Sequence, residues 1–351
     1  SMNIDQYKNS INTGLKRLEE MVLKINDLVE NRIQKNLKQV SRAILVSLPE
    51  GRAVTLDEFV LMQESSVKAY THKLAMRNLE VEHAVEDLIA IIASSSNLDP
   101  TIGAIAAEDI EEVHNHFSSM TYQAYLNCVK NSLNMLKKRT CYRVGQIKLE
   151  PFFEVDVQLS VPSVRLSPSL DEIQSAINLS AVAVFSAMKK MWQWKQQDLP
   201  ERERKSFFDI MGLDIEIIKV VLLLTGAMHG TRNIVHEYLK SFGKYNWLWK
   251  EEPEVSYRAF MKTNPSLPDF EAELMRFMTL EKEINSIVGE RVIGSLKLHT
   301  ANIKKTLIDE TRQWKQSYSA KVHKLAKDAM ARLYEYLRVL TNKLNIEVQS
   351  L

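Results

Sequence analysis

Apolar residues near the start of the chain recur at the spacing of an α-helix. Successive members lie three or four positions apart, with fours in the majority, so the mean spacing exceeds the ~3.6 residues of a helical turn. The series is Leu18, Val22, Ile25, Val29, Ile33, Leu37, Val40 and Ile44. Such a stripe stays straight or drifts slightly right-handed, which favours a packed bundle helix over a long two-stranded coiled coil. We expect one helix from residue 4 to about residue 45, ended by Pro49 and Gly51.

The same period continues over most of the chain. The second helix should begin at Thr55, with Glu58 completing a capping box, and a similar pair, Ser169 and Glu172, should open a later helix. Three serines and Pro100 should end the second helix. The expected helices cover residues 55–95, 108–137, 169–194, 214–242, 254–261, 269–287 and 300–344.

Three of these helices carry more specific expectations. The helix at 108–137 should bury a face that includes Phe117, Cys128 and Met135. The helix at 214–242 contains Gly226 and Gly230, four residues apart, which should let a neighbouring helix pack closely. The last helix should bury a stripe that runs from Ile303 to Leu344, among them Trp314, Tyr318, Leu325, Leu333 and Leu337.

One segment alternates with period two instead. Residues 153–161 read as a strand bounded by Pro151 and Pro162, and residues 292–298 could pair with it. We take this change of pattern as a junction between two domains, residues 1–144 and 145–351. The predicted fold is mainly α, an elongated array of helical bundles with one or two short extended or β segments.

Composition narrows the class of protein. The 46 Lys and Arg residues nearly balance the 44 Asp and Glu residues, which excludes a field that would attract nucleic acid or an anionic membrane. Two cysteines, Cys128 and Cys141, cannot form a disulfide framework and fit a reducing cytosol. No apolar run reaches the ~18 residues that span a bilayer. The opening Ser1-Met2 is typical of a cleaved expression tag, so we expect a fragment.

The sequence predicts no catalytic residue, no cofactor-binding residue and no metal site. No GxxxxGK[ST] loop is present to hold a triphosphate, and no GxSxG marks a nucleophile. His114 and His116 point to different sides of a helix, while His229 and His236 have no third ligand at a suitable spacing. Acidic pairs such as Glu111-Glu112 are better explained as helix-terminal charges than as acid–base pairs.

Three blocks of sequence carry a resemblance. The first runs from Leu224 to Phe277 and includes the pattern YL..F..Y..LW from Tyr238 to Trp249 and an Asn264-Pro265 turn. The others run from Pro151 to Asn178 and from Val292 to Lys315. In order and rough spacing they resemble the stem of axonemal dynein heavy chains, shortly before the motor's linker.

The resemblance implies a function without supplying chemistry. It implies a piece of a microtubule motor of cilia that transmits force and binds intermediate chains, light chains or a second heavy chain. ATP and Mg²⁺ would bind only in the parent's motor domain, and microtubules would be reached only through that motor. The implied location is the cytoplasm, in the cytoskeleton of the ciliary axoneme, with no nucleic acid or membrane as partner.

Two other classes remain open. A tethering rod or helical scaffold without a motor explains the helices and the charge balance equally well, but not the three blocks. A helical GTPase-activating domain has no positive feature in the sequence.

Within the first block, residues 226–277 combine an apolar helix, glycines and tryptophans, so we expect a packing hub that buries Trp249.

The length of the last helix generates a prediction about the size of the molecule. Forty-five residues at 1.5 Å each give roughly 65 Å, longer than a compact domain of this size needs. Small-angle scattering should therefore return a radius of gyration clearly above the roughly 20 Å of a compact chain. A value near that figure would rule out the elongated array.

Overall fold

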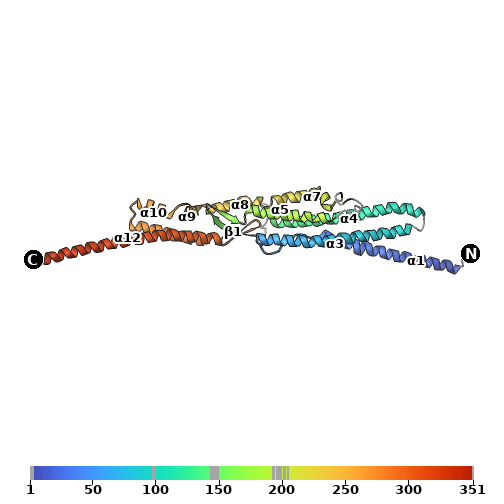
Figure 1. The fold of residues 1–351 in the computed structure, drawn as a ribbon, viewed down its shortest axis with the longest axis horizontal. Helices are drawn as coiled ribbons and strands as arrows, with labels where there is room; N and C mark the ends of the chain where they lie inside the picture. Colours follow the sequence, from blue (N-terminus) through green and yellow to red (C-terminus); the bar gives the residue numbers. More distant parts are fainter. Residues whose placement is uncertain are drawn as a thin grey trace. The chain divides into compact units, whose positions relative to one another are not determined.

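The structure, a computed structural model, consists almost entirely of helices, with one small sheet (Figure 1). It describes residues 4–96, 100–142, 150–191, 194, 200, 203 and 205–349. The mainly α fold with short strands that the sequence predicts is confirmed. Two compact units are present, Ser1–Phe153 with Leu170–Thr231 and Glu154–Ser169 with Arg232–Leu351. The domains 1–144 and 145–351 stay a prediction.

The first unit is a set of packed helices. Its elements are α1 (Ile4–Asn26), a π-helix η1 (Asp27–Gln34), α2 (Lys35–Arg42), α3 (Leu56–Ser96), α4 (Pro100–Thr140), α5 (Leu170–Ser186), the 3-10 helix η2 (Ala187–Lys190), α6 (Phe207–Met211), α7 (Ile215–Thr225) and the first turn of α8 (His229–Lys240). The predicted first helix is confirmed from Ile4 to Arg42. Its first part, α1, buries no residue, so the expected packing of Leu18 and Val22 is wrong. Its middle is a π-helix, whose turns are wider than those of an α-helix. The run of four-residue spacings from Ile25 to Leu37 therefore reflects wider turns and not a right-handed drift.

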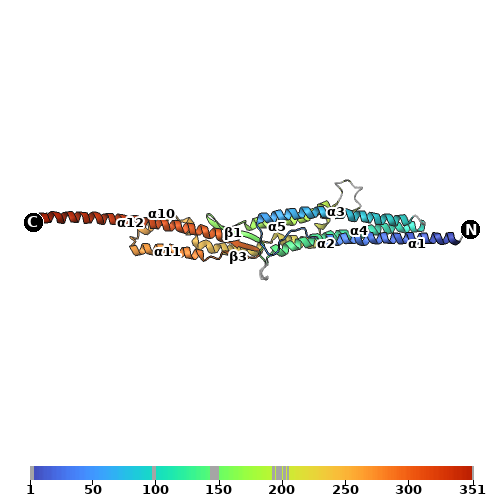
Figure 2. The same ribbon diagram turned by 90° about the horizontal axis from the view of Figure 1, so that it is seen from below.

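A heptad seam on α3 holds the long hairpin together. Figures 1 and 2 show α3 and α4 side by side. Buried residues on α3 alternate between spacings of four and three, namely Val67, Thr71, Leu74, Asn78, Val81, Val85 and Leu88. This is the a/d pattern by which one helix faces another. From α4, the Tyr125 hydroxyl donates a hydrogen bond of 2.8 Å to the Leu74 carbonyl inside this seam.

The hairpin corrects two expectations and qualifies a third. Pro100 does not merely end the preceding helix; it is the first residue of α4, where its missing N–H costs nothing. Met135 is 40% exposed, and Leu136 takes the buried position. At the start of α3, Thr55 Oγ1 accepts from the Glu58 N–H at 3.2 Å, as the capping box predicts. The Glu58 carboxylate is nevertheless held by Arg52 at 3.2 Å.

The predicted helix at 214–242 is wrong as a single element. Asp214 caps α7 by accepting from the Ile217 N–H at 3.0 Å, but the helix ends at Thr225. Gly226 leaves helical geometry there, and α8 begins at His229. The buried Ala227 and Met228 form the connection.

The second unit combines a sheet with the C-terminal helices. Its elements are β1 (Phe153–Ser160, from its second residue), β2 (Ser163–Ser167), the rest of α8, the 3-10 helix η3 (Ser241–Tyr245), α9 (Trp247–Lys250), α10 (Pro253–Met261), α11 (Leu267–Asn285), β3 (Glu290–Ile293), β4 (Leu296–His299) and α12 (Ala301–Gln349). The strand order is β2-β1-β4-β3, so the predicted pairing of the two alternating segments is confirmed. The helices expected near 254–261 and 269–287 are confirmed as α10 and α11.

The last helix is buried along only part of its predicted stripe. α12 packs on α9, α10 and α11 through its first half, with Ile303, Leu307, Trp314 and Tyr318 buried. From Leu325 to Leu344 the apolar side chains are exposed, so burial of the whole stripe was a wrong expectation. Among the described residues of this unit, none buries the apolar side chains of that half of the helix.

Gly226, which follows α7, and Gly230, in the first turn of α8, differ sharply in their surroundings, which generates a prediction. A Cβ on Gly230 would lie 2.5 Å from the Tyr142 carbonyl oxygen, whereas a Cβ on Gly226 would meet only the Leu223 carbonyl oxygen, at 3.9 Å. Only Gly230 therefore permits the close approach that the sequence suggested for both. Gly230→Ala should lower the melting temperature in circular dichroism, although alanine favours a helix by about 1 kcal/mol.

Gly226→Ala is the matched control and should melt close to the parent temperature. A Gly230→Ala protein that melts at or above the parent temperature would contradict the close contact with Tyr142.

Candidate protein interaction site

An aromatic cluster centred on Trp314 positions the helices of the second unit. The Trp314 ring meets Trp247 edge to face, with centroids 5.0 Å apart, and lies 6.3 Å from Phe277. Its indole N–H donates a 2.9 Å hydrogen bond to the Leu248 carbonyl. Trp314 is 2% exposed, so this one side chain ties α12 to both α9 and α11.

The cluster continues along α12 through Tyr318. The Tyr318 ring lies 5.4 Å from Phe277, 5.5 Å from Tyr257 and 5.9 Å from Phe260. Phe260 in turn meets Phe270 at 5.0 Å. The rings come from four helices and pack on one another, so they form a core and not a ligand site.

The structure revises the roles expected of the tryptophans. Trp249 and Trp247 are both half-buried, and Trp249 donates to the Pro162 carbonyl at 3.2 Å. The deeply buried indole is that of Trp314 and not Trp249. Trp194 is buried with its ring 5.8 Å from His114, and Trp192 lies outside the described residues.

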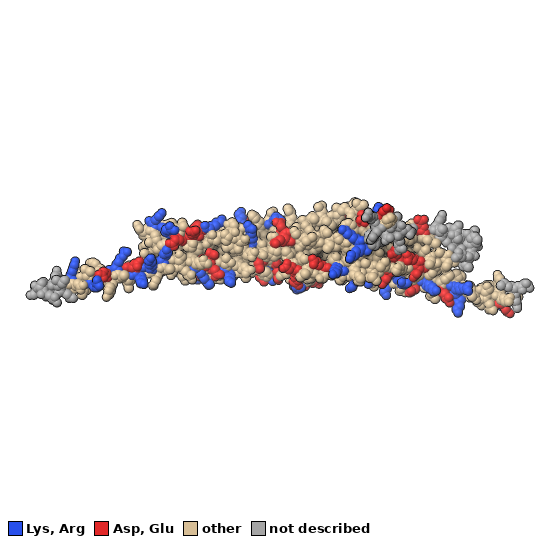
Figure 3. All heavy atoms as spheres, viewed as in Figure 1, with Lys and Arg blue, Asp and Glu red and all other residues tan. Residues whose placement is uncertain are grey.

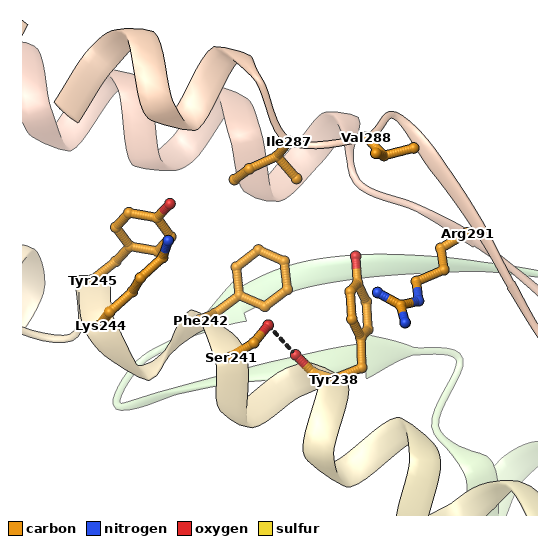
Figure 4. Close-up of a pocket in the computed structure, with 8 residues that line it drawn as sticks. All are labelled: Tyr238, Ser241, Phe242, Lys244, Tyr245, Ile287, Val288 and Arg291. Carbon is orange, nitrogen blue, oxygen red and sulfur yellow. Dashed lines mark hydrogen bonds between the residues drawn. The ribbon is translucent and has the colours of Figure 1, made fainter. Parts of the chain in front are cut away.

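A groove opens on the second unit between α8 and the segment that leads into β3 (Figure 4). Its cavity has a volume of about 410 Å³, with Tyr238 and Phe242 on one side and Ile287 and Val288 on the other. Arg291 closes one end, and its guanidinium stacks 4.7 Å from the Tyr238 ring centroid. A second hollow of about 550 Å³ continues past that pair. No pattern in the sequence indicated this groove.

At the other end of the groove, the charged side chains form an ion pair with each other. Lys244 forms an ion pair with Glu283, which also accepts from the Tyr245 hydroxyl at 3.2 Å. Hydrogen bonding to Glu283 raises the pKa of Lys244, and the same bond lowers the pKa of Glu283. Burial raises the pKa of Tyr238 against the opposing charge of Arg291. Lys244, Glu283 and Tyr238 therefore hold their ordinary charge near neutral pH.

The residues considered for metal or acid chemistry stay apart. His229 and His236 are exposed on α8, and His116 is exposed on α4 beside Phe117, with ring centroids 5.2 Å apart. Among the described residues, no three His, Cys, Asp or Glu side chains gather as metal ligands do. Burial raises the pKa of the Cys128 thiol to about 12, which makes it an inert core residue.

The distribution of charge on the surface matches the near-equal numbers of acidic and basic residues in the sequence. On the face shown in Figure 3, basic and acidic side chains are interspersed and no large field of one sign forms. No helix in the described part of the chain is both long and apolar enough to cross a membrane.

Comparison with known proteins supplies the family. The whole chain aligns with the gamma chain of the flagellar outer arm dynein of Chlamydomonas reinhardtii, at 37% identity. It also aligns over its whole length with axonemal dynein heavy chain 8 of Homo sapiens and heavy chain 5 of Rattus norvegicus, each at 24% identity. The chain is homologous to axonemal dynein heavy chains. No protein-family model matches it.

The homology covers only a small part of each dynein heavy chain. The chain spans 8% of the Chlamydomonas protein, 10% of the human protein and 13% of the rat protein. The dynein resemblance of the three sequence blocks is thus confirmed. Two of those blocks supply the adjacent strands β1 and β4 of the sheet.

The aromatic cluster generates a prediction about stability. Trp314→Ala should destabilise this dynein segment by about 3–5 kcal/mol, because it leaves a cavity between three helices. It also leaves the Leu248 carbonyl without its indole donor. Urea unfolding followed by circular dichroism measures the loss.

Trp249→Ala is the control, and it should cost clearly less because that indole is half-buried. Trp314→Phe should fall between the two, since it keeps a ring but removes the hydrogen bond. Equal losses for Trp314→Ala and Trp249→Ala would contradict the central position of Trp314.

Proposed function

We propose that this chain is a stem segment of an axonemal dynein heavy chain, the part that joins the base of the motor to its linker. One observation carries the proposal: every residue aligns with heavy chains, yet the aligned part is 8–13% of their length. The sequence of this part holds no phosphate-binding loop. Its role is therefore mechanical and assembling, and the parent protein supplies the ATPase.

Long helices suit the transmission of force. α3 and α4 have 41 residues each and α12 has 49. At 1.5 Å per residue these helices measure about 60 Å and 75 Å. A helix whose stripe is packed along a neighbour resists bending, because any bend would break close-packed contacts. The packed helices α3 and α4 and the packed first half of α12 are the feature that favours a load-bearing stem.

The partners follow from the same proposal. A stem would bind other dynein chains, whether intermediate, light or a second heavy chain, and would reach microtubules only through the motor. Its place would be the ciliary axoneme. The parent transcript tests the proposal directly: a linker and several GxxxxGK[ST] motifs downstream support it, whereas a stop codon favours a tethering rod.

The missing phosphate loop generates a prediction about nucleotides. Because few glycines are present and none stands in such a loop, the purified chain should neither bind nor hydrolyse ATP. Isothermal titration of Mg·ATP into the protein should show heats of dilution only. A saturable signal with a micromolar Kd would overturn the assignment of a purely mechanical role.

A further inference from the structure

The strand β3 lies at an edge of the sheet. In the order β2-β1-β4-β3 it pairs with β4 on one side, and no described strand pairs with its other side. Glu290, Arg291 and Val292 are exposed. An exposed edge presents unpaired N–H and C=O groups, which another extended chain can pair with.

The hairpin turn decides which backbone groups face outward. Gly294 and Ser295 form a two-residue turn, with Gly294 at a φ of 60°, and Ile293 lies opposite Leu296. In such a hairpin the residues that flank the turn form a hydrogen-bonded pair, and the pairs alternate from there. Arg291 therefore bonds inward to β4, whereas the N–H and C=O of Val292 and Glu290 point away from the sheet.

The groove described above adjoins this edge. Arg291 and Ile293 lie on one face of β3, and their cross-strand partners on β4 are the buried Leu298 and Leu296. On the same face, Arg291 contacts the Tyr238 ring of α8. A strand added to β3 would direct alternate side chains to the same face. There they would meet apolar walls already exposed to solvent: Val288 is 71% exposed and Ile234 is 38% exposed.

Charge selects the occupant. Lys244 and Arg291 line the two hollows, and Glu237 also lines the second one. Lys244 pairs with Glu283, and Glu237 pairs with Lys240. Each of these two carboxylates is paired with a lysine, so Arg291 is the lining cation that is left for an acidic ligand. Arg291 takes part in none of the ion pairs formed by the described residues. Stacking on Tyr238 fixes its guanidinium plane but leaves the N–H edge able to bind a carboxylate.

We propose that the edge of β3 and the adjoining groove bind an extended acidic segment of a partner protein as a fifth strand. The backbone of the segment pairs with Val292, a Glu or Asp side chain binds Arg291, and an apolar side chain enters the hollow between Tyr238 and Val288. Main-chain pairing supplies affinity and the groove supplies specificity. The groove and the strand are the only evidence for this site, so it does not depend on the stem assignment.

A defined peptide tests the proposal. The probe is a fluorescein-labelled peptide of about ten residues, a strand's length, that alternates Glu with Val and has Phe in place of one central Glu, so that Phe and the remaining Glu side chains share a face. Fluorescence anisotropy with the whole chain should show saturable binding that weakens as salt rises. The same peptide with Lys in place of Glu should not bind. Equal binding of the two peptides, or no binding of the acidic one, would overturn the proposal.

Matched variants assign the binding to this edge. Arg291→Glu should weaken binding of the acidic peptide at least about tenfold, because a charge-assisted hydrogen bond is lost and a repulsion gained. Arg165→Glu makes the same charge change on β2, the opposite edge strand, and should leave binding unchanged. If both variants weaken binding equally, the effect is net charge and the proposal fails.

Two further substitutions separate the backbone from the groove. Val292→Pro removes the outward N–H while sparing the ladder to β4, and Val288→Asp places a charge in the apolar hollow. Both should abolish binding with little change in melting temperature. Leu267→Asp, at a residue 75% exposed on α11, is the control for Val288→Asp and should bind as the parent does. Full binding by Val292→Pro would exclude strand addition.

Discussion

Burial of an apolar stripe against a neighbouring helix is the interaction on which the hairpin of α3 and α4 and the first half of α12 depend. Helices in water are marginal without tertiary contacts, because their nucleation is costly and each residue adds little. The heptad seam of α3 meets α4 in the first unit, and the first half of α12 meets α9, α10 and α11 in the second. Where the stripe of α12 continues without a neighbour among the described residues, the helix has only its intrinsic propensity.

The candidate interaction site follows from that packing. Trp314 and Tyr318 fix α12, and the strand β4 leads directly into its first turn. β4 in turn carries β3 at the sheet edge, where Arg291 meets Tyr238 of α8. The groove is thus a consequence of how a two-residue hairpin and one helix end are held beside each other. This arrangement leaves an open strand edge, that of β3, beside the helices of the second unit.

Periodicity predicted the helices and the pairing of the two alternating segments, because both depend on local spacing and burial. It could not predict the break at Gly226, since an apolar pattern continues through Ala227 and Met228 whether or not the helix does. It also could not show which of Gly226 and Gly230 faces a carbonyl. The groove was invisible for a similar reason: Tyr238 and Arg291 are distant in sequence, and each alone reads as an ordinary surface residue.

Hydrogen exchange along α12 tests the central role of helix packing most directly. Backbone amides from Ile303 to Tyr318 should exchange roughly a hundredfold more slowly than those beyond Leu325, the ratio given by about 3 kcal/mol of opening free energy. The helix is continuous through both halves, so only the neighbours differ. Uniform slow exchange to Leu344 would contradict the account, because it would mean that the exposed half is stable without a packed partner.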